Sequence, residues 1–277
     1  MLVEMGAILR KATAQGYGIA APNVFDGESV RVCFEAANEL RAPMVIDAGG
    51  NLDIEYIADV VRFYSNKYPE VPVALNLDHG KNFESLAKAI RAGFTSVMID
   101  RSQVPFEENV KETAEVVRMA HSVGVSVEAE LGHVGQGSNY EVDRTSFLTR
   151  PEEVVEFVKR TKVDFLAVAI GNAHGLYVGS PQLDLDLLSE IRNVTPIPLV
   201  LHGGSSTGDS NLQNAIAHGI SKVNLGTDLG LAGTKAVQEF LSSNSKARVG
   251  AVTAAGINGY KAELMRYMKL FGEENRW

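Results

Sequence analysis

The chain has little cysteine and no long apolar run. Its 277 residues include one cysteine, Cys33, so no disulfide can form within the chain, and we expect a cytoplasmic protein. No stretch reaches the roughly 18 consecutive apolar residues that a membrane-spanning helix needs. Residues 1–10 are too short and too charged for a signal peptide. These features predict a protein that has no membrane partner.

The sequence also has no block of charge of one sign. Its 26 basic and 34 acidic residues are interspersed and give a formal net charge of −8. This distribution argues against a nucleic-acid partner, but a small anionic substrate needs only a local site. No linker rich in proline, glycine or serine interrupts the chain, so residues 1–277 are expected to form a single domain.

Apolar runs alternate with amphipathic helical patterns along the whole chain. The expected strands lie at 19–24, 43–47, 73–80, 96–100, 126–130, 165–171, 198–201 and 221–226. The expected helices lie at 3–15, 28–40, 53–66, 83–92, 107–122, 151–161, 184–192, 211–218, 228–243 and 252–270. Eight strand–helix units in one domain predict an α/β protein, a (β/α)₈ TIM barrel with an N-terminal helix and extra C-terminal helices.

A doubly wound open sheet is the alternative to the barrel. Two observations argue against it. No Gly-x-Gly-x-x-Gly turn follows the first strand. Polar candidates follow strands three to eight, whereas an open sheet would gather them at one switch point.

Three of the expected strands are each followed by a His-Gly pair, at His79, His174 and His202. The carboxyl ends of parallel barrel strands meet at one mouth, so these imidazoles can face one point. Three neutral imidazoles suit zinc, or less tightly cobalt or manganese, with a position left open for substrate. A single histidine of this kind is more often a hydrogen-bonded core residue, but three at equivalent positions favour a metal site.

Acidic side chains lie beside these histidines. Asp100 and Glu130 end two strands, where they could cap the next element, support the histidines or offer another metal position. Asp78 directly precedes His79, where a proton donor or acceptor would be useful. Lysines that could form a Schiff base are lacking at the strand ends. Lys222 lies at the start of the last strand, on the wrong face, and Lys81 would reach the mouth only if its loop folds back.

Two glycine-bearing loops follow the last two strands. They read His-Gly-Gly-Ser-Ser-Thr-Gly at 202–208 and Asn-Leu-Gly-Thr-Asp at 224–228, the second of them opening a helix. Glycines let backbone N–H groups approach an anion, and the N-terminus of a helix favours negative charge. Barrels often bind phosphate with these two loops, so the sequence predicts a phosphate site next to the metal.

Together these motifs resemble the class II ketose-bisphosphate aldolases, which include fructose- and tagatose-bisphosphate aldolases. The resemblance spans nearly the whole chain and rests on residues 77–80, 96–100, 105–109, 127–132, 167–171, 174–175, 201–205, 222–224 and 227–228. It implies a zinc-dependent enzyme that cleaves a phosphorylated ketose into dihydroxyacetone phosphate and an aldehyde. It also implies a homodimer or homotetramer, with a sodium or potassium ion near the phosphate.

The resemblance further implies roles for individual residues. His79, His174 and His202 match the zinc ligands, Asp78 matches the catalytic acid, and Asp100 and Glu130 match acids near the metal. The implied contacts to dihydroxyacetone phosphate are Gly175, Gly203, Gly204, Ser205, Asn224, Leu225, Gly226 and Thr227.

The sequence departs from the family pattern at two places that matter for function. The family has an acidic loop after the fifth strand, whose glutamate exchanges the proton at C3. Here the nearest acids are Glu141 and Asp143, and the base is unassigned. No basic residue clearly matches the one that holds the far phosphate, although Arg101 is a candidate. A metal-dependent hydrolase or lyase on the same barrel, and a weakly catalytic sugar-phosphate-binding relative, are therefore the alternatives.

Overall fold

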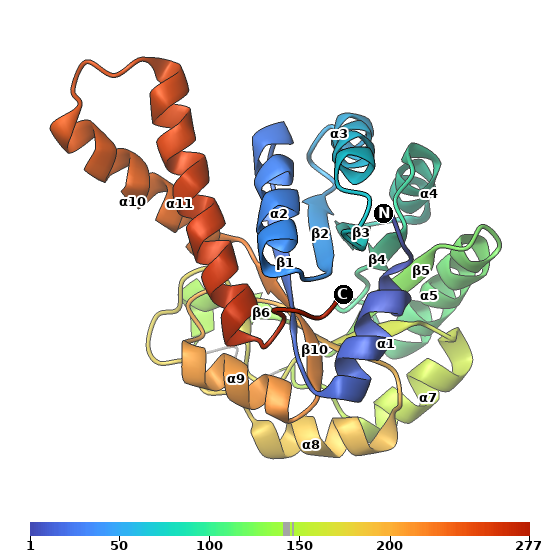
Figure 1. Cartoon of the computed structure of the whole chain (residues 1–277). Helices are drawn as coiled ribbons and strands as arrows, with labels where there is room; N and C mark the ends of the chain where they lie inside the picture. The colour runs from blue at the N-terminus through green and yellow to red at the C-terminus, as the bar shows by residue number, and fades with distance from the viewer. Residues whose placement is uncertain (141–144, 146) are drawn as a thin grey trace.

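Eight parallel strands close into a barrel in the order β1-β10-β9-β7-β5-β4-β3-β2 (Figure 1). The computed structural model describes residues 1–140, 145 and 147–277. The barrel strands are β1 (Ile19–Val24), β2 (Met44–Gly49), β3 (Val73–Gly80), β4 (Ser96–Ile99), β5 (Ser126–Leu131), β7 (Phe165–Val168), β9 (Leu199–Leu201) and β10 (Ile220–Leu225). The barrel prediction is confirmed, and closure excludes the open sheet.

Helices surround the barrel, and the last two project from it as a long helical hairpin (Figure 1). The helices are α1 (Met5–Gln15), α2 (Gly27–Leu40), α3 (Ile54–Lys67), α4 (Phe83–Ala92), α5 (Phe106–His121), α7 (Pro151–Thr161), α8 (Leu185–Val194), α9 (Asp209–Ala217), α10 (Thr227–Ser243) and α11 (Val249–Leu270). The predicted helices agree with these bounds within three residues. No described helix is long and apolar enough to cross a membrane.

Helix α4 shows how the sequence sets these boundaries. The Asn82 side chain accepts a hydrogen bond from the Ser85 N–H at 2.9 Å, which satisfies a backbone donor of the first turn. The helix ends at Gly93, which takes φ 106°, a left-handed conformation that glycine adopts without strain. The helix therefore begins at Phe83, two residues after Lys81 and three after the end of β3.

The barrel interior is apolar at one end and polar at the other. Residues Met5, Ile8, Leu9 and Ala12 of α1 join inward-facing strand residues in one buried cluster. This helix therefore closes the amino-terminal end of the barrel. The charged and polar interior positions lie at the opposite end, where ligands bind in barrels of this kind.

Two details of the region after β5 differ from the prediction. The sixth strand was expected over 165–171, but it ends at Val168, and Gly171 turns the chain with φ 93°. No strand or helix was predicted between 131 and 150, yet this segment contains β6 (Gly135–Gln136), which pairs with β8 (Ala173–His174), and the short 3-10 helix η1 (Gly137–Asn139). This small sheet brings His174 back over the mouth. The candidate acids Glu141 and Asp143 lie outside the described residues.

Candidate metal centre and substrate pockets

The end of β3 is distorted at the residue that organises the site. The register between β3 and β4 shifts between Leu77 and Gly80, and His79 takes φ 49°, an uncommon conformation for a residue with a side chain. A Cβ atom at Gly80 would lie 2.6 Å from the carbonyl oxygen of Met98, so only glycine fits there. Irregularities of this kind re-aim side chains near functional sites, and here the imidazole is turned into the mouth.

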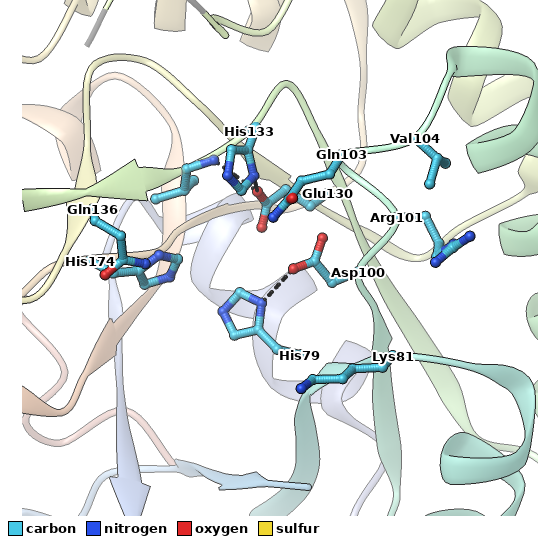
Figure 2. Close-up of a pocket in the computed structure, with 11 residues that line it drawn as sticks. His79, Lys81, Asp100, Arg101, Gln103, Val104, Glu130, His133, Gln136 and His174 are labelled. Carbon is cyan, nitrogen blue, oxygen red and sulfur yellow. Dashed lines mark hydrogen bonds and ion pairs between the residues drawn. The ribbon is translucent and has the colours of Figure 1, made fainter. Parts of the chain in front are cut away.

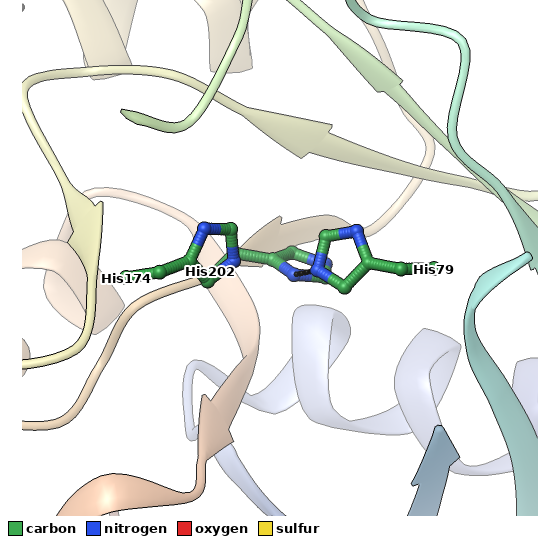
Figure 3. A group of neighbouring side chains, drawn as sticks. All are labelled: His79, His174 and His202. Carbon is green, nitrogen blue, oxygen red and sulfur yellow. Dashed lines mark hydrogen bonds between the residues drawn. The ribbon is translucent and has the colours of Figure 1, made fainter. Parts of the chain in front are cut away.

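The three predicted histidines lie together (Figure 3). The ring centres of His79 and His202 are 4.7 Å apart, those of His79 and His174 are 5.0 Å apart, and those of His174 and His202 are 5.8 Å apart. One ring nitrogen from each lies within 4.8 Å of the others, close enough to share a metal ion. The structure therefore brings together the imidazole trio that the sequence predicted.

Carboxylates hold the far sides of two of these rings. Nδ1 of His79 lies 2.9 Å from Asp100, which leaves Nε2 facing His202. Nε2 of His202 lies 2.8 Å from Glu128, which leaves Nδ1 facing His79 at 3.0 Å. Metal-binding histidines usually have such a partner on the second nitrogen, because it fixes the tautomer and the ring orientation.

The third imidazole supplies a direct test of whether a metal fits. Nε2 of His174 is buried and has no hydrogen-bond partner among the described residues. Burial, reinforced by the charges of His202 and His79, lowers the pKa of His174 to about 4, so this ring is neutral at pH 7. A buried nitrogen with a free lone pair is costly unless something binds it, and a divalent cation would.

The charge state of His79 differs from that of His174. Burial disfavours the charged ring, but the hydrogen bond to Asp100 and the charge of Asp78 outweigh this and raise the pKa of His79 to about 10. Without metal, the surrounding carboxylates therefore hold a positive charge at this point. The same carboxylates would stabilise the positive charge of a bound metal ion, so their arrangement fits a metal site.

A second group of possible ligands lies beside the first. His79, Asp100 and Glu130 also offer ligand atoms within 4.8 Å of one another. One oxygen of Glu130 accepts from the N–H of Val134 at 2.9 Å, and the other is buried without a partner in the described part of the chain. Figure 2 shows Asp100 and Glu130 on the same side of His79. The two acids could support the trio or form an alternate metal position.

Asp78 is held at both oxygens by amide groups. Asn23 donates to one oxygen at 2.7 Å and Asn224 donates to the other at 3.1 Å. Burial alone would raise the pKa of Asp78, but the charges of His79 and His202, with the bond from Asn23, lower it. Asp78 is therefore an oriented, ionised carboxylate next to the trio.

A buried chain of charges lies below the histidines. Glu128 accepts from the Lys222 ammonium at 3.0 Å, and Lys222 also lies 3.1 Å from Asp47. All three side chains are fully buried, and Asn76 donates to Asp47 at 2.8 Å. Placing Lys222 on the wrong face was an error, because its side chain lies inside the barrel and is linked to His202 through Glu128.

The two glycine-bearing loops pack against each other. The hydroxyl oxygen of Ser205 accepts from the N–H groups of Gly226 at 3.3 Å and Asp228 at 3.1 Å. A Cβ atom at Gly203, where φ is 66°, would lie 2.0 Å from the carbonyl oxygen of Ala173. This packing brings the first loop against the N-terminus of α10.

Three cavities meet at His79. The loop pocket, about 160 Å³, is lined by Asn23, Asp78, His79, His174, Gly175, His202, Gly203, Ser205, Asn224, Gly226 and Thr227. The acid pocket, about 500 Å³, is lined by His79, Lys81, Asp100, Arg101, Gln103, Val104, Glu130, His133, Val134, Gln136 and His174. The β1–β3 pocket, about 650 Å³, is lined by Asn23, Val24, Phe25, Gly49, Gly50, Asn51, Leu52, Leu77, Asp78, His79, Gly80, Lys81, Asn82 and Ser85.

Two of the predicted phosphate contacts do not line the loop pocket. The N–H of Gly204 donates to Asn224 at 3.1 Å, so it is engaged in the barrel wall. The side chain of Leu225 is buried in the core between the barrel and its helices. The contacts of these two residues to dihydroxyacetone phosphate stay predictions, because only the other six predicted residues line the loop pocket.

Sequence reasoning also missed several polar partners of the site. Glu128, Asp47 and Asn76 were not singled out, nor was Asn23, which holds Asp78. A signal was present, because a charged residue inside an otherwise apolar parallel strand must find a partner in the interior.

Comparisons with known proteins give a consistent picture. Residues 3–276 match the model of a family described as fructose-bisphosphate aldolase class-II. The chain is 44% identical over 261 residues to a fructose-bisphosphate aldolase of Helicobacter pylori, covering 84% of this chain and 85% of that protein. It is 39% identical to one of Geobacillus stearothermophilus, covering 99% and 98%. A crystal structure of the YdjI aldolase from Escherichia coli K12 superposes with a TM-score of 0.87 at 33% identity, covering 99% and 98%.

Proposed function

The chain belongs to the class II fructose-bisphosphate aldolase family and is a lyase that cleaves a phosphorylated ketose by aldol chemistry; we propose that its products are dihydroxyacetone phosphate and an aldehyde. The family is metal-dependent. The observation that carries the proposal is the convergence of three imidazoles and Asp78 on one point beside the loop pocket.

Zinc is the metal that we propose, with cobalt or manganese as weaker substitutes, because it suits three imidazole nitrogens; His79 would give up its proton when the metal binds. His79 and His174 would hold it through Nε2 and His202 through Nδ1, the nitrogens that their carboxylate partners leave free or that lack a partner. When bound, the metal acts as a Lewis acid that stabilises the negative charge left on the triose when the C3–C4 bond breaks. Asp100 and Glu130 are proposed to support this site or to form an alternate position.

Asp78 is proposed to move the proton at the C4 oxygen. In cleavage its carboxylate takes the proton from the C4 hydroxyl as the aldehyde carbonyl forms, and in condensation it returns that proton. The lowered pKa of Asp78 supports the first role, and the two amide bonds from Asn23 and Asn224 fix the direction of its oxygens. The base that exchanges the proton at C3 stays unassigned, since Glu141 and Asp143 lie outside the described residues.

The loop pocket is proposed to hold the triose phosphate through Gly175, Gly203, Ser205, Asn224, Gly226 and Thr227. The Ser205 oxygen already accepts two backbone N–H groups, so its own O–H is free to donate to a phosphate oxygen. Helix α10, 17 residues long, starts at Thr227 and favours negative charge at this end. A sodium or potassium ion beside the phosphate is part of the same proposal.

Exchange of the C3 proton of dihydroxyacetone phosphate into heavy water tests this function. Metal-loaded protein should exchange it, and a chelator should stop the exchange. A protein that binds the triose phosphate without exchange would be the weakly catalytic relative. Failure of the triose phosphate to protect the protein against heat would favour the hydrolase or lyase alternative.

Three further expectations stay predictions. They are a homodimer or homotetramer, a cytoplasmic location, and a single domain over residues 1–277. Sedimentation of the intact chain would test the first of them.

A further inference from the structure

When the substrate is bound, its two halves must extend from the metal centre into different cavities. If the triose phosphate occupies the loop pocket, the aldehyde half occupies either the acid pocket or the β1–β3 pocket. The position of Asp78 distinguishes them, because the C4 oxygen belongs to the aldehyde half and must face this carboxylate. Asp78 lines the loop pocket and the β1–β3 pocket but not the acid pocket. The aldehyde half therefore lies in the β1–β3 pocket.

The lining of the β1–β3 pocket contains few charges. Apart from Asp78 and His79, Lys81 is the one ionisable residue among the described residues that line it, and its polar groups are the amides of Asn23, Asn51 and Asn82 and the hydroxyl of Ser85. Side-chain amides such as that of Asn51 suit the hydroxyl groups of a sugar chain, whereas Asn82 and Ser85 are already bonded to each other in the cap of α4. The pocket therefore offers one cation for an anionic end group.

Lys81 has no competing partner in the described structure. No hydrogen bond or ion pair joins its ammonium to another described residue, and the side chain is exposed. In Figure 2 the Lys81 side chain runs toward His79 and ends below it, and it lines both the acid pocket and the β1–β3 pocket. Lys81 directly follows β3, so its side chain lies beside the mouth.

Arg101, the candidate that the sequence offered, is placed differently. It lines the acid pocket rather than the β1–β3 pocket. Its guanidinium donates to Glu108 at 3.2 Å and to Glu112 at 3.2 Å, and it points away from the His79–Asp100 pair (Figure 2). Two carboxylates already neutralise its charge.

We propose that Lys81 determines specificity by binding a terminal anion, a phosphate or a carboxylate, on the aldehyde half of the substrate in the β1–β3 pocket. This inference rests on the proposed function, because it takes the triose phosphate to be in the loop pocket and Asp78 to act at the C4 oxygen. It assigns Lys81 to substrate recognition and gives it no covalent role.

Condensation of dihydroxyacetone phosphate with three aldehydes tests the assignment. The aldehydes are glyceraldehyde 3-phosphate, a semialdehyde that ends in a carboxylate, and uncharged glyceraldehyde. A hydrogen bond to a charged group corresponds to roughly a 10- to 100-fold effect. We expect the wild type to prefer one of the anionic aldehydes in kcat/KM by about this factor, and the preferred one identifies the anion.

Variants then identify the residue that causes the preference for an anionic aldehyde. Lys81→Met should lower kcat/KM for the preferred anionic aldehyde by about 10- to 100-fold, and Lys81→Arg should keep most of the preference. Lys88→Met, which removes an exposed lysine of α4, is the matched control and should keep all of it. The preference should weaken with added salt, since exposed charges are screened.

Each contrary result overturns a definite part of the reasoning. A preference that survives Lys81→Met, or is lost in Arg101→Met instead, overturns the assignment, as does a wild type without any preference. Exchange of the C3 proton reports on the triose half alone. Absence of exchange in the wild type refutes the proposed function. Loss of exchange in Lys81→Met alone would place the lysine at the triose and refute the inference.

Discussion

Replacing Lys222 with methionine tests whether the buried charges below the metal centre stabilise the barrel. The Lys222 ammonium lies 3.0 Å from Glu128 and 3.1 Å from Asp47, and all three side chains are fully buried. Removing one partner of a buried ion pair costs about 3–5 kcal/mol, because the remaining charge stays in the interior without compensation. At about 2 °C per kcal/mol for a chain of this size, the Tm should fall by about 6–10 °C.

The same variant should show a pH dependence of known sign. Burial raises the pKa of Asp47 in the wild type, although Lys222 opposes this. Without the lysine, the folded-state pKa of Asp47 should rise further above its unfolded value. Glu128, whose pKa Lys222 and His202 hold low against burial in the wild type, should also move upward. Groups with a raised folded-state pKa lose their contribution to stability as the pH rises. The Tm deficit should therefore be larger at pH 8 than at pH 5.5.

Thermal unfolding of the metal-free protein, followed by circular dichroism, measures both effects. Adding Asp47→Asn and Glu128→Gln to Lys222→Met should recover part of the lost Tm, because no charge is then left unpaired. Lys88→Met on the outer surface is the control and should change the Tm by less than about 2 °C. A deficit below about 2 °C in Lys222→Met, equal at both pH values, would refute the reasoning.

Three other predictions concern the metal and one distant carboxyl group. Chelation should abolish cleavage and zinc should restore it, whereas a lysine adduct trapped by borohydride would contradict the metal mechanism. Asp100→Asn should weaken zinc binding roughly 10- to 100-fold in a chelator competition, because Nδ1 of His79 loses a charged partner 2.9 Å away; unchanged affinity would count against that role. Burial raises the pKa of Glu273 well above its ordinary value, so the folded state retains this proton and loses stability as the pH rises. Glu273→Gln keeps an acceptor for the Ala20 N–H, 3.1 Å away, and removes the group that must stay protonated, so it should raise the Tm at pH 8 but not at pH 4. If the Tm of variant and wild type changed with pH in the same way, this role of Glu273 would be excluded.

The fold could be predicted because its signals are local. Runs that are apolar on both faces mark buried parallel strands, and eight of them separated by amphipathic helices leave few architectures. The short strands β6 and β8 could not be predicted in this way. Each has two residues, and their pairing depends on how two distant loops meet, which no local pattern encodes.

The histidine trio could be predicted for a different reason. Parallel strands in a barrel end at the same mouth, so three His-Gly pairs at strand ends converge whatever the loop details. The rotation of each ring could not be predicted. The bulge before Gly80 and the left-handed backbone of His79 turn that ring toward Asp100, and both depend on close packing against β4.

Strand periodicity explains why the site and the charges below it form one unit. Side chains two residues apart on a strand face the same side, so the position below Asp78 is Asn76, and the position below Glu130 is Glu128. By the same rule Lys222 lies below Asn224. Asp78, Glu130 and Asn224 therefore each stand above a polar residue of the same strand, and these lower residues are hydrogen-bonded or ion-paired across the barrel. A substitution of one of these lower residues should therefore alter metal binding, because Lys222 contacts Glu128 and Glu128 holds His202, although no metal ligand itself is changed.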